Sequence, residues 1–286
     1  MLEHISESQR ALWYSCPRKW FYKYVACIEL DMPESQYLTK GKAFHEALDK
    51  GRSSSHGKSL LTSYRSLVAG WCALPYDASF HSAVTCLYQQ VEEDQGRIIE
   101  SEKEVKVDSY SFLGYYDGYD VENGVIVEDK TTSNNQMMEP YRWTSASQIY
   151  AYLWVAKKNN YPVDRLEWNV YNLANTEGWR EKFYFSATDT QLQEYENGLD
   201  YFYQKFLIFQ QERAGLKRIS QVHGRKDLQR LAPMVYGTTC NQFGGCEYKN
   251  LCASEDWLTT VRESGSFRKK KKSARGIQCV KSTKVR

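Results

Sequence analysis

The spacing of apolar residues divides the chain into helical and strand-forming stretches. Near the N-terminus, Ser6 and Gln9 have the spacing of a capping box and precede an apolar pair, which predicts a helix that ends near Pro17. Apolar residues at helical spacing predict further helices over 39–50, 59–73 and 79–99. The first hundred residues are therefore expected to be mainly helical.

The apolar period changes to two between Glu102 and Lys130, which predicts three antiparallel strands. Helices are then predicted over 141–158 and from Thr188 to Arg213. Two more strands are predicted between these helices, over 164–173 and 178–185. This order of helices and strands indicates an α/β fold built around one sheet.

The strongest local signal is a hairpin over residues 113–132. Asn123 and Gly124 lie between β-branched and aromatic residues, a sequence typical of a two-residue turn with positive φ at both positions. Such a turn brings Asp117 close to Glu128. Because side chains alternate along a strand, Lys130 is expected on the same face as Glu128, with Asp129 on the other.

Two carboxylates beside an ammonium group suggest a metal site. Carboxylates repel each other unless a cation lies between them, and a set of oxygen ligands favours Mg²⁺ or Mn²⁺. A metal there, with Lys130 stabilising developing charge, would suit phosphodiester hydrolysis. The alternative is an exposed hairpin on which Glu128 and Lys130 form a surface ion pair of little consequence.

Composition adds a charge asymmetry. The chain has 286 residues and a formal net charge of +3, but nine Lys and Arg residues and no acid lie between Ser266 and Arg286. The remainder holds 29 basic and 35 acidic residues, so residues 266–286 are predicted to form a disordered basic tail that tethers DNA. No run of 18 apolar residues and no signal peptide is found, which predicts a cytoplasmic protein without a membrane anchor.

A second candidate site consists of cysteines. Cys240, Cys246 and Cys252 cluster in a segment poor in regular periodicity, and a reducing compartment makes disulfides unexpected. A four-thiolate site needs one more ligand, and the spacing leaves Cys16, Cys27, Cys72, Cys86 and Cys279 open for that position. Both a [4Fe-4S] cluster and zinc remain candidates, as do unligated thiols.

Six motifs in sequence order resemble the RecB-like branch of the PD-(D/E)xK nuclease superfamily. They are Cys16-Pro-Arg-Lys, Gly41-x-x-x-His45, Gly114-x-x-Asp117, Glu128-x-Lys130, Gln148-x-x-x-Tyr152 and the C-terminal cysteines. The chain is most similar to the iron–sulfur members, such as the AddB nuclease domain and CRISPR-associated adaptation nucleases. The resemblance covers about residues 5–255 and implies a restriction-endonuclease-like core, in which a central mixed sheet is flanked by helices.

The resemblance also implies roles for individual residues. A catalytic metal would be held by His45, Asp117, Glu128 and the backbone carbonyl of Asp129, with Lys130 as the catalytic lysine. Gln148 and Tyr152 would contact the DNA backbone or support Lys130. A [4Fe-4S] cluster would be held by Cys16, Cys240, Cys246 and Cys252, joining the N- and C-terminal parts of a single domain over 1–265. Five residues separate Cys240 from Cys246 where relatives have C-x-x-C, so Cys240 departs from the pattern.

The implied function is a Mg²⁺- or Mn²⁺-dependent deoxyribonuclease, an exonuclease on single strands or DNA ends in recombination, repair or replication. Because the sequence has no G-x-x-x-x-G-K-[ST] loop, a helicase or recombination protein is the expected partner. One alternative is a non-catalytic nucleic-acid-binding or assembly subunit that keeps the fold and cluster. Another is a structural zinc protein with an incidental hairpin.

Overall fold

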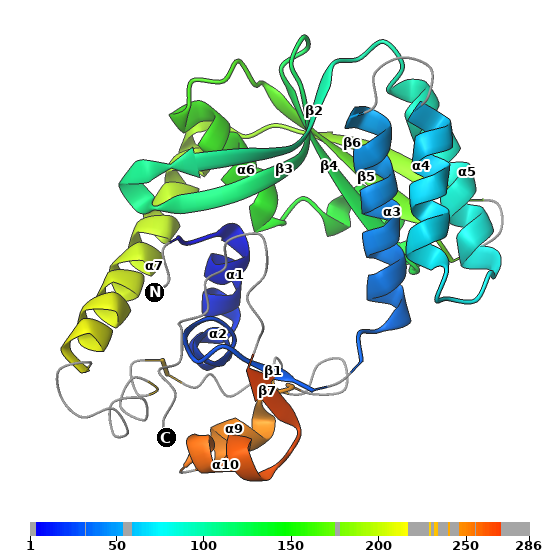
Figure 1. Ribbon diagram of the computed structural model, residues 1–286. Coiled ribbons are helices and arrows are strands. Elements are labelled where there is room, and N and C mark those ends of the chain that lie inside the picture. The colour runs from blue at the N-terminus through cyan, green and yellow to red at the C-terminus, as the bar shows by residue number, and fades with distance from the viewer. Residues whose placement is uncertain are drawn as a thin grey trace. The chain divides into compact units, whose positions relative to one another are not determined.

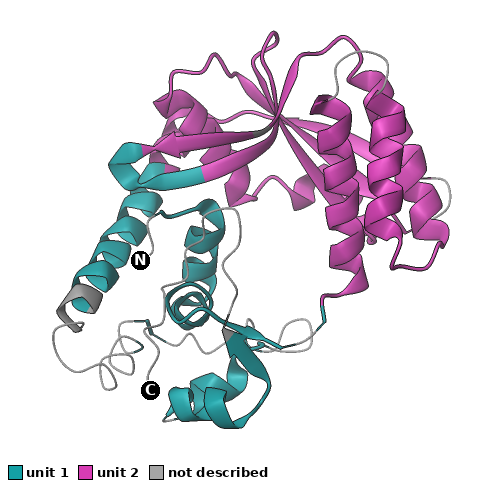
Figure 2. Cartoon of the chain, viewed as in Figure 1, with its two compact units in different colours: residues 1–33, 108–113, 196–286 teal, residues 34–107, 114–195 magenta. Residues whose placement is uncertain are grey.

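A computed structural model describes residues 4–31, 33–53, 59–174, 178–216, 229, 232–233, 240, 246–254 and 256–269. The chain divides into two compact units, coloured separately in Figure 2. Unit 1 comprises residues 1–33, 108–113 and 196–286, and unit 2 comprises residues 34–107 and 114–195. The single domain expected over 1–265 stays a prediction.

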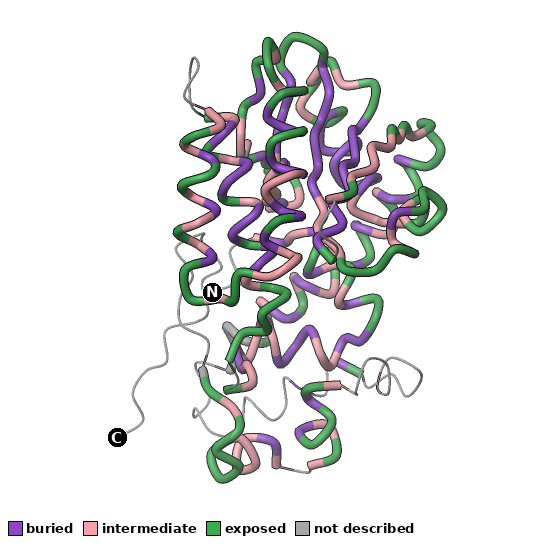
Figure 3. The backbone as a smooth tube through the Cα atoms, turned by 90° about the vertical axis from the view of Figure 1, so that its right-hand side faces the viewer, coloured by how far each residue is buried: buried purple, intermediate pink, exposed green. Residues whose placement is uncertain are grey.

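A five-stranded sheet forms the centre of unit 2 (Figure 1), and one of its strands begins in unit 1. Its order is β2-β3-β4-β5-β6, formed by Ile99–Val107, Phe112–Asp120, Val125–Thr132, Arg165–Asn172 and Trp179–Phe185. β4 runs antiparallel to β3 and parallel to β5, and β5 runs antiparallel to β6. The predicted mixed sheet is therefore confirmed. β4 and β5 are buried along most of their length (Figure 3), as expected for central strands.

Three helices pack together beside this sheet: α3 (Gln36–Ser53), α4 (Ser59–Trp71) and α5 (Ala78–Glu93). Their apolar sides form a core that includes Phe44, Leu67 and Trp71, and this core extends to Tyr171 of β5. The rings of Phe44 and Tyr171 lie 4.8 Å apart between centroids. The core thus fixes α3 to the sheet, and α3 is the helix that carries His45.

Several helix ends differ from the prediction for local reasons. α5 ends at Glu93 rather than near residue 99, because Asp94 caps it and Gly96 then turns the chain at a φ of +81°. The helix predicted from 141 begins at Ser147, as α6 (Ser147–Lys158). Before it come two 3-10 turns, η3 (Asn135–Met138) and η4 (Pro140–Arg142). Trp143 closes this segment by donating its indole N–H to the carbonyl of Met137 at 2.8 Å.

The hairpin turn is longer than predicted. Four residues, Val121 to Gly124, connect β3 and β4, and only Gly124 has a positive φ, at +61°. Asp120 accounts for the difference, because its carboxylate accepts bonds from the backbone N–H of Asn123 at 3.1 Å and from the Asn123 side chain. This local bonding replaces the two-residue turn that the Asn-Gly pair suggested.

Unit 1 contains short helices around an aromatic core. Its N-terminal part holds α1 (Glu7–Ser15), α2 (Pro17–Trp20), the π-helical turn η1 (Phe21–Val25) and β1 (Ile28–Leu30). Its C-terminal part holds α9 (Lys249–Ala253), α10 (Trp257–Glu263) and β7 (Phe267–Lys269), and α7 (Asp189–Leu216) spans both units. Trp20, Phe21 and Tyr22 are almost fully buried, so the aromatic residues after Pro17 belong to the core. Among the described helices, none is both long and apolar enough to cross a membrane.

The start of the predicted disordered tail is ordered. Phe267–Lys269 pairs antiparallel with β1, and Arg268 bonds to Glu29 at 3.0 Å and to Asp31 at 2.9 Å. The strand pairing and these two ion pairs explain why the basic composition did not leave this part irregular. Residues 270–286 lie outside the described residues, so a disordered tail there stays a prediction.

The space around Gly124 gives a test of the turn. A Cβ at this position would lie 2.0 Å from the carbonyl oxygen of Pro162, whereas Gly96, also at positive φ, has nothing within 4 Å. We expect Gly96→Ala to cost about 1–2 kcal/mol from backbone strain alone. Gly124→Ala should cost clearly more, because a clash with backbone is added. Urea unfolding of both variants measures this, and equal losses would contradict the described turn.

Candidate active site

Strand β4 presents functional side chains on both of its faces. Glu128 and Lys130 contact each other and share one face, as the alternation of the strand predicts. Asp129 faces the other way, where its carboxylate contacts Arg52 of α3 and Tyr171 of β5. β4 therefore contacts α3 through one face and carries Glu128 and Lys130 on the other.

The carboxylate of Glu128 is the most buried acidic group of this site. The residue is 2% exposed, and its Oε1 accepts bonds from the ammonium of Lys130 and from the Gln148 amide at 2.7 Å. Its Oε2 is buried and has no hydrogen-bond partner among the described residues. Burial and the nearby Asp117 carboxylate raise the pKa of Glu128 to about 8, with Lys130 opposing them. A buried carboxyl oxygen without a partner suits a ligand of a cation.

Asp117 lies directly beyond the paired part of β3. The register of β3 and β4 runs from Asp120–Val125 to Gly118–Val127, and the Asp117 carboxylate then accepts the backbone N–H of Asp129 at 2.9 Å. The same carboxylate oxygen, Oδ2, lies 3.9 Å from Nδ1 of His45. Both side chains are about one-third exposed, so solvent reaches this part of the site.

Lys130 lies between an acid and an aromatic ring. Its ammonium contacts Glu128 and lies 5.0 Å from the ring centroid of Trp168, and the side chain is 27% exposed. Trp168 is the neighbour of Glu128 across the parallel β4–β5 register and packs on Trp143 at 5.2 Å. Burial alone would lower the pKa of Lys130, but Glu128 and Asp117 outweigh it and raise this pKa. The lysine therefore stays charged at neutral pH.

Two residues on α6 support Glu128 from the adjacent helix. The side-chain N–H groups of Gln148 donate to Oε1 of Glu128 and to the hydroxyl of Tyr152, each with an N–O distance of 2.7 Å. Tyr152 in turn donates to the carbonyl of Tyr115 in β3 at 2.6 Å. The i, i+4 spacing of Gln148 and Tyr152 puts both on one helix face, so α6 links β3 to the buried acid.

The donor set fits a divalent cation by its chemistry. It offers the partnerless Oε2 of Glu128, the carboxylate of Asp117 and the imidazole of His45. Within the described ranges, however, no three acidic, imidazole or thiol side chains are already arranged to hold a metal ion. Lys130 and Gln148 bond to Oε1 of Glu128, which leaves Oε2 as the oxygen of this carboxylate that is open to a cation.

The four predicted cysteine ligands belong to unit 1 and are free thiols. Cys27, which the spacing had left open as a ligand, is disulfide-bonded, so the prediction that disulfides are absent is wrong at this residue. The backbone N–H of Cys246 donates to the carbonyl of Cys240 at 2.9 Å. Burial raises the pKa of Cys252 to about 11; Arg18 opposes this, and Cys16, Cys246 and Cys240 add to it. The four thiols are thus close enough to affect one another electrostatically, although none of the described groups is arranged as a metal site. Residues 241–245 of the predicted cysteine loop lie outside the described residues.

The sequence matches the family described as the PD-(D/E)XK nuclease superfamily over residues 4–253, most of the chain. This chain belongs to the PD-(D/E)XK nuclease superfamily. It is also similar to a solved structure from Eubacterium rectale described as a candidate exonuclease, with 13% sequence identity and a TM-score of 0.48. That similarity covers 72% of this chain and 80% of the other. A search of curated proteins found no match.

The PD-(D/E)XK core brings most of the predicted residues together. Glu128, Lys130, Gln148 and Tyr152 are linked by direct contacts. Asp117 accepts the backbone N–H of Asp129, the neighbour of Glu128, and lies 3.9 Å from His45. Two residues of the site were not predicted: Arg52, which contacts Asp129, and Trp168, which contacts Lys130.

The sequence did contain one indication of polar contacts around Asp129, because Glu167, Asn169 and Tyr171 alternate with apolar residues in the buried strand β5. Polar residues at period two in a buried strand indicate a buried polar network.

The raised pKa of Glu128 predicts how stability changes with pH in metal-free protein. This carboxyl loses its proton near pH 4.5 when unfolded and near pH 8 when folded. Between these values the folded state holds a proton that the unfolded state has lost, so stability falls as pH rises. In EDTA, Glu128→Gln should remove this part of the decline between about pH 5 and 8, as urea unfolding would measure. If the free energy of unfolding fell with pH equally in parent and variant, the raised pKa of Glu128 would be contradicted.

Proposed function

We propose that this protein is a metal-dependent deoxyribonuclease that hydrolyses phosphodiester bonds. The observation that carries the proposal is the Glu128 carboxylate, buried with one oxygen unpartnered, beside Asp117 and in contact with Lys130. Membership in the nuclease superfamily supports the same chemistry. A purely structural acid in a buried strand would have both oxygens satisfied.

Mg²⁺ or Mn²⁺ would be held by Glu128, Asp117 and His45, with the backbone carbonyl of Asp129 as a further ligand. Oxygen donors with one imidazole suit these hard cations. When bound, the cation would supply Lewis-acid chemistry, polarising phosphate oxygens and lowering the pKa of a water molecule. Binding would also favour the ionised form of Glu128, whose pKa is otherwise raised by burial.

The remaining residues act on charge and orientation. Lys130 carries a positive charge that would stabilise the negative charge developing on a phosphate. The ring of Trp168, 5.0 Å from that ammonium, would help to hold it beside the site. Gln148 and Tyr152 hold the strand and helix around Glu128 together, and their polar atoms could also contact the DNA backbone.

The substrate and setting belong to the proposal as well. We expect an exonuclease that acts on single strands or DNA ends in recombination, repair or replication, together with a helicase or recombination protein as partner. Residues 266–286 would tether DNA through their basic side chains. End-labelled single- and double-stranded DNA, each labelled at either end and incubated with Mg²⁺ or Mn²⁺, would establish strand preference and polarity.

A [4Fe-4S] cluster held by Cys16, Cys240, Cys246 and Cys252 is proposed for unit 1, with zinc as the alternative. The electrostatic proximity of the four thiols supports it. Burial raises the pKa of Cys246 and Cys252, so both would stay protonated at neutral pH unless a metal displaced their protons. Such a site would tie the N-terminal helices of unit 1 to its C-terminal segment.

Loss of the Lys130 ammonium should abolish cleavage. Lys130→Ala is expected to lower the cleavage rate by about 100-fold or more, the usual effect of removing one group that stabilises transition-state charge. The matched control is Lys157→Ala on α6, an exposed lysine paired with Asp189, which should cleave at the parental rate. Single-turnover assays at saturating Mg²⁺ measure both, and circular dichroism checks the fold. Parental cleavage by Lys130→Ala would leave the non-catalytic subunit as the better account.

Loss of one cysteine ligand should remove the cluster. After anaerobic purification, Cys252→Ser is expected to lose the broad absorbance near 400 nm and most of its iron, and to melt at a lower temperature, because a link between distant segments is gone. Cys72→Ser, which changes an exposed thiol of unit 2, should keep both signals. Parent protein that contains zinc would favour the structural zinc site, and unchanged iron in Cys252→Ser would exclude that residue as a ligand.

A further inference from the structure

A buried ion pair joins α3 to the strand that carries the candidate active site. Arg52, near the end of α3, donates to both carboxylate oxygens of Asp129, at 2.5 Å and 3.3 Å. The two side chains are 3% and 1% exposed. Burial would raise the pKa of Asp129, but Arg52 outweighs it and lowers this pKa. The contact is bidentate, a geometry that fixes direction as well as distance.

The carboxylate of Asp129 is held by further donors. The Asn169 amide reaches its Oδ1 at 3.1 Å and the Tyr171 hydroxyl reaches the same oxygen at 2.9 Å. Tyr171 has one proton to donate and also lies 3.0 Å from the side-chain amide oxygen of Gln90. The charged carboxylate of Asp129 is the stronger acceptor of the two. Asp129 consequently has little freedom to turn.

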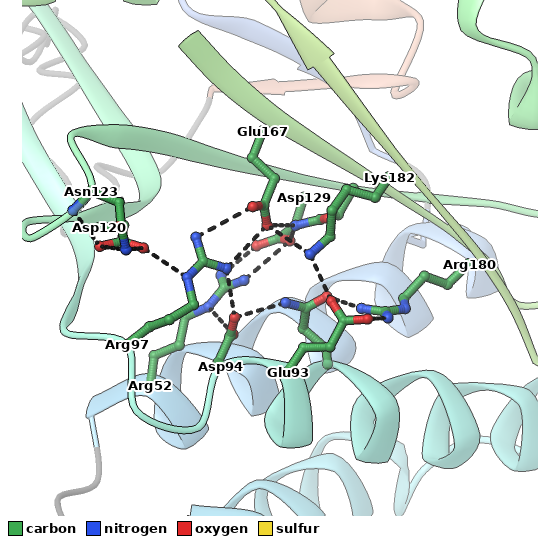
Figure 4. Close-up of polar contacts among 12 residues, drawn as sticks. Arg52, Glu93, Asp94, Arg97, Asp120, Asn123, Asp129, Glu167, Arg180 and Lys182 are labelled. Carbon is green, nitrogen blue, oxygen red and sulfur yellow. Dashed lines mark hydrogen bonds and ion pairs between the residues drawn. The ribbon is translucent and has the colours of Figure 1, made fainter. Parts of the chain in front are cut away.

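Arg52 is fixed on its other side by the network in Figure 4. Its Nε donates to Asp94 at 3.0 Å, at the end of α5. Asp94 also accepts from Arg97, which in turn pairs with Asp120 of β3 at 2.7 Å and with Glu167 of β5. The guanidinium of Arg52 thus connects α3, α5 and β4 at one point, behind the face on which Glu128 and Lys130 lie.

The backbone of Asp129 carries this constraint to the metal site. Its N–H holds Oδ2 of Asp117 at 2.9 Å, and that oxygen is the one 3.9 Å from His45. His45 and Arg52 are seven residues apart on α3, two turns along one helix face. Gly41, near the start of α3, packs directly against Thr131 of β4. A Cβ on Gly41 would lie only 2.8 Å from Oγ1 of Thr131.

Helix α3 is therefore attached to β4 at two points about 16 Å apart, with His45 between them. Close packing at Gly41 and the apolar core around Phe44 hold the helix against the sheet, but apolar packing is not directional. The bidentate contact at Arg52 adds a directional attachment at the other end of the helix.

We propose that Arg52 is a positioning residue for the metal site: through Asp129 it sets how the helix carrying His45 lies against the strand carrying Glu128. The inference rests on the proposed function. Arg52 does not touch substrate or metal in this account, and it acts by keeping the ligands in place. Groups that orient metal ligands from behind commonly change metal affinity by about 10- to 100-fold when removed.

A matched ion pair separates this role from ordinary structural support. Arg97 and Asp120 form another ion pair of the same network, with side chains 18% and 1% exposed, and neither bonds directly to α3 or to Asp117 within the described residues. Arg97→Met should lower thermal stability and leave metal affinity within about twofold. Arg52→Met should lower both, and Arg52→Lys, which keeps the charge but loses the bidentate geometry, should retain part of the affinity.

The experiment is titration of the full-length, metal-free protein with Mn²⁺, followed by electron paramagnetic resonance well below the melting temperature. We expect Mn²⁺ affinity to fall about 10-fold or more in Arg52→Met. If that variant does not fold, the double variant Arg52→Met with Asp129→Asn leaves no unpaired carboxylate at position 129 and should show the same loss.

Parental Mn²⁺ affinity in Arg52→Met, or in the double variant, would overturn the inference, as would an equal loss in Arg97→Met. In both cases the proposed function would stand, because the parent still binds metal and Asp117→Asn would still abolish binding. A parent protein that binds no Mn²⁺ would overturn the proposed function and this inference with it.

Discussion

The buried carboxylate of Glu128 is the constraint on which the rest of the site depends. A carboxyl group that is 2% exposed, close to Asp117, is unfavourable as an anion, and its raised pKa expresses that cost. Lys130 and Gln148 satisfy only one of its two oxygens. The fold therefore maintains an unsatisfied acid in a central strand, where an apolar residue would stabilise the sheet more. Local instability of this kind is typical of functional sites.

The two faces of strand β4 contact different helices. On one face, Glu128 and Lys130 meet α6 through Gln148, and on the other, Asp129 meets α3 through Arg52. Breaking a buried pair such as the latter usually costs about 3–5 kcal/mol, since one charge is left without its partner. Pairing with β3 ends at Gly118–Val127, and the carboxylate of Asp117 takes the next backbone N–H of β4. The candidate ligands Asp117 and Glu128 thus lie just beyond the paired part of β3 and β4.

Much of this arrangement was predictable because it depends on short-range patterns. Strand alternation gave the shared face of Glu128 and Lys130, and the i, i+4 spacing gave the shared face of Gln148 and Tyr152. The mixed sheet followed from family resemblance. The four-residue turn was missed because the Asp120 carboxylate, not the Asn-Gly pair, sets its length.

Long-range contacts explain the other differences. Arg52 lies 77 residues from Asp129 in sequence, and neither residue indicates its partner. The strand at Phe267–Lys269 needs β1, more than two hundred residues earlier, to accept its hydrogen bonds. Composition alone assigned this segment to a disordered tail, because a run of basic residues carries no information about a pairing strand.

The central claim is that Glu128, Asp117 and His45 form one metal centre beside Lys130. Anomalous diffraction from crystals grown with Mn²⁺ tests it most directly, because the map locates the ion without assuming any activity. One strong peak is expected within about 2.5 Å of the carboxylates of Asp117 and Glu128. A map without a peak near these two carboxylates would contradict the claim.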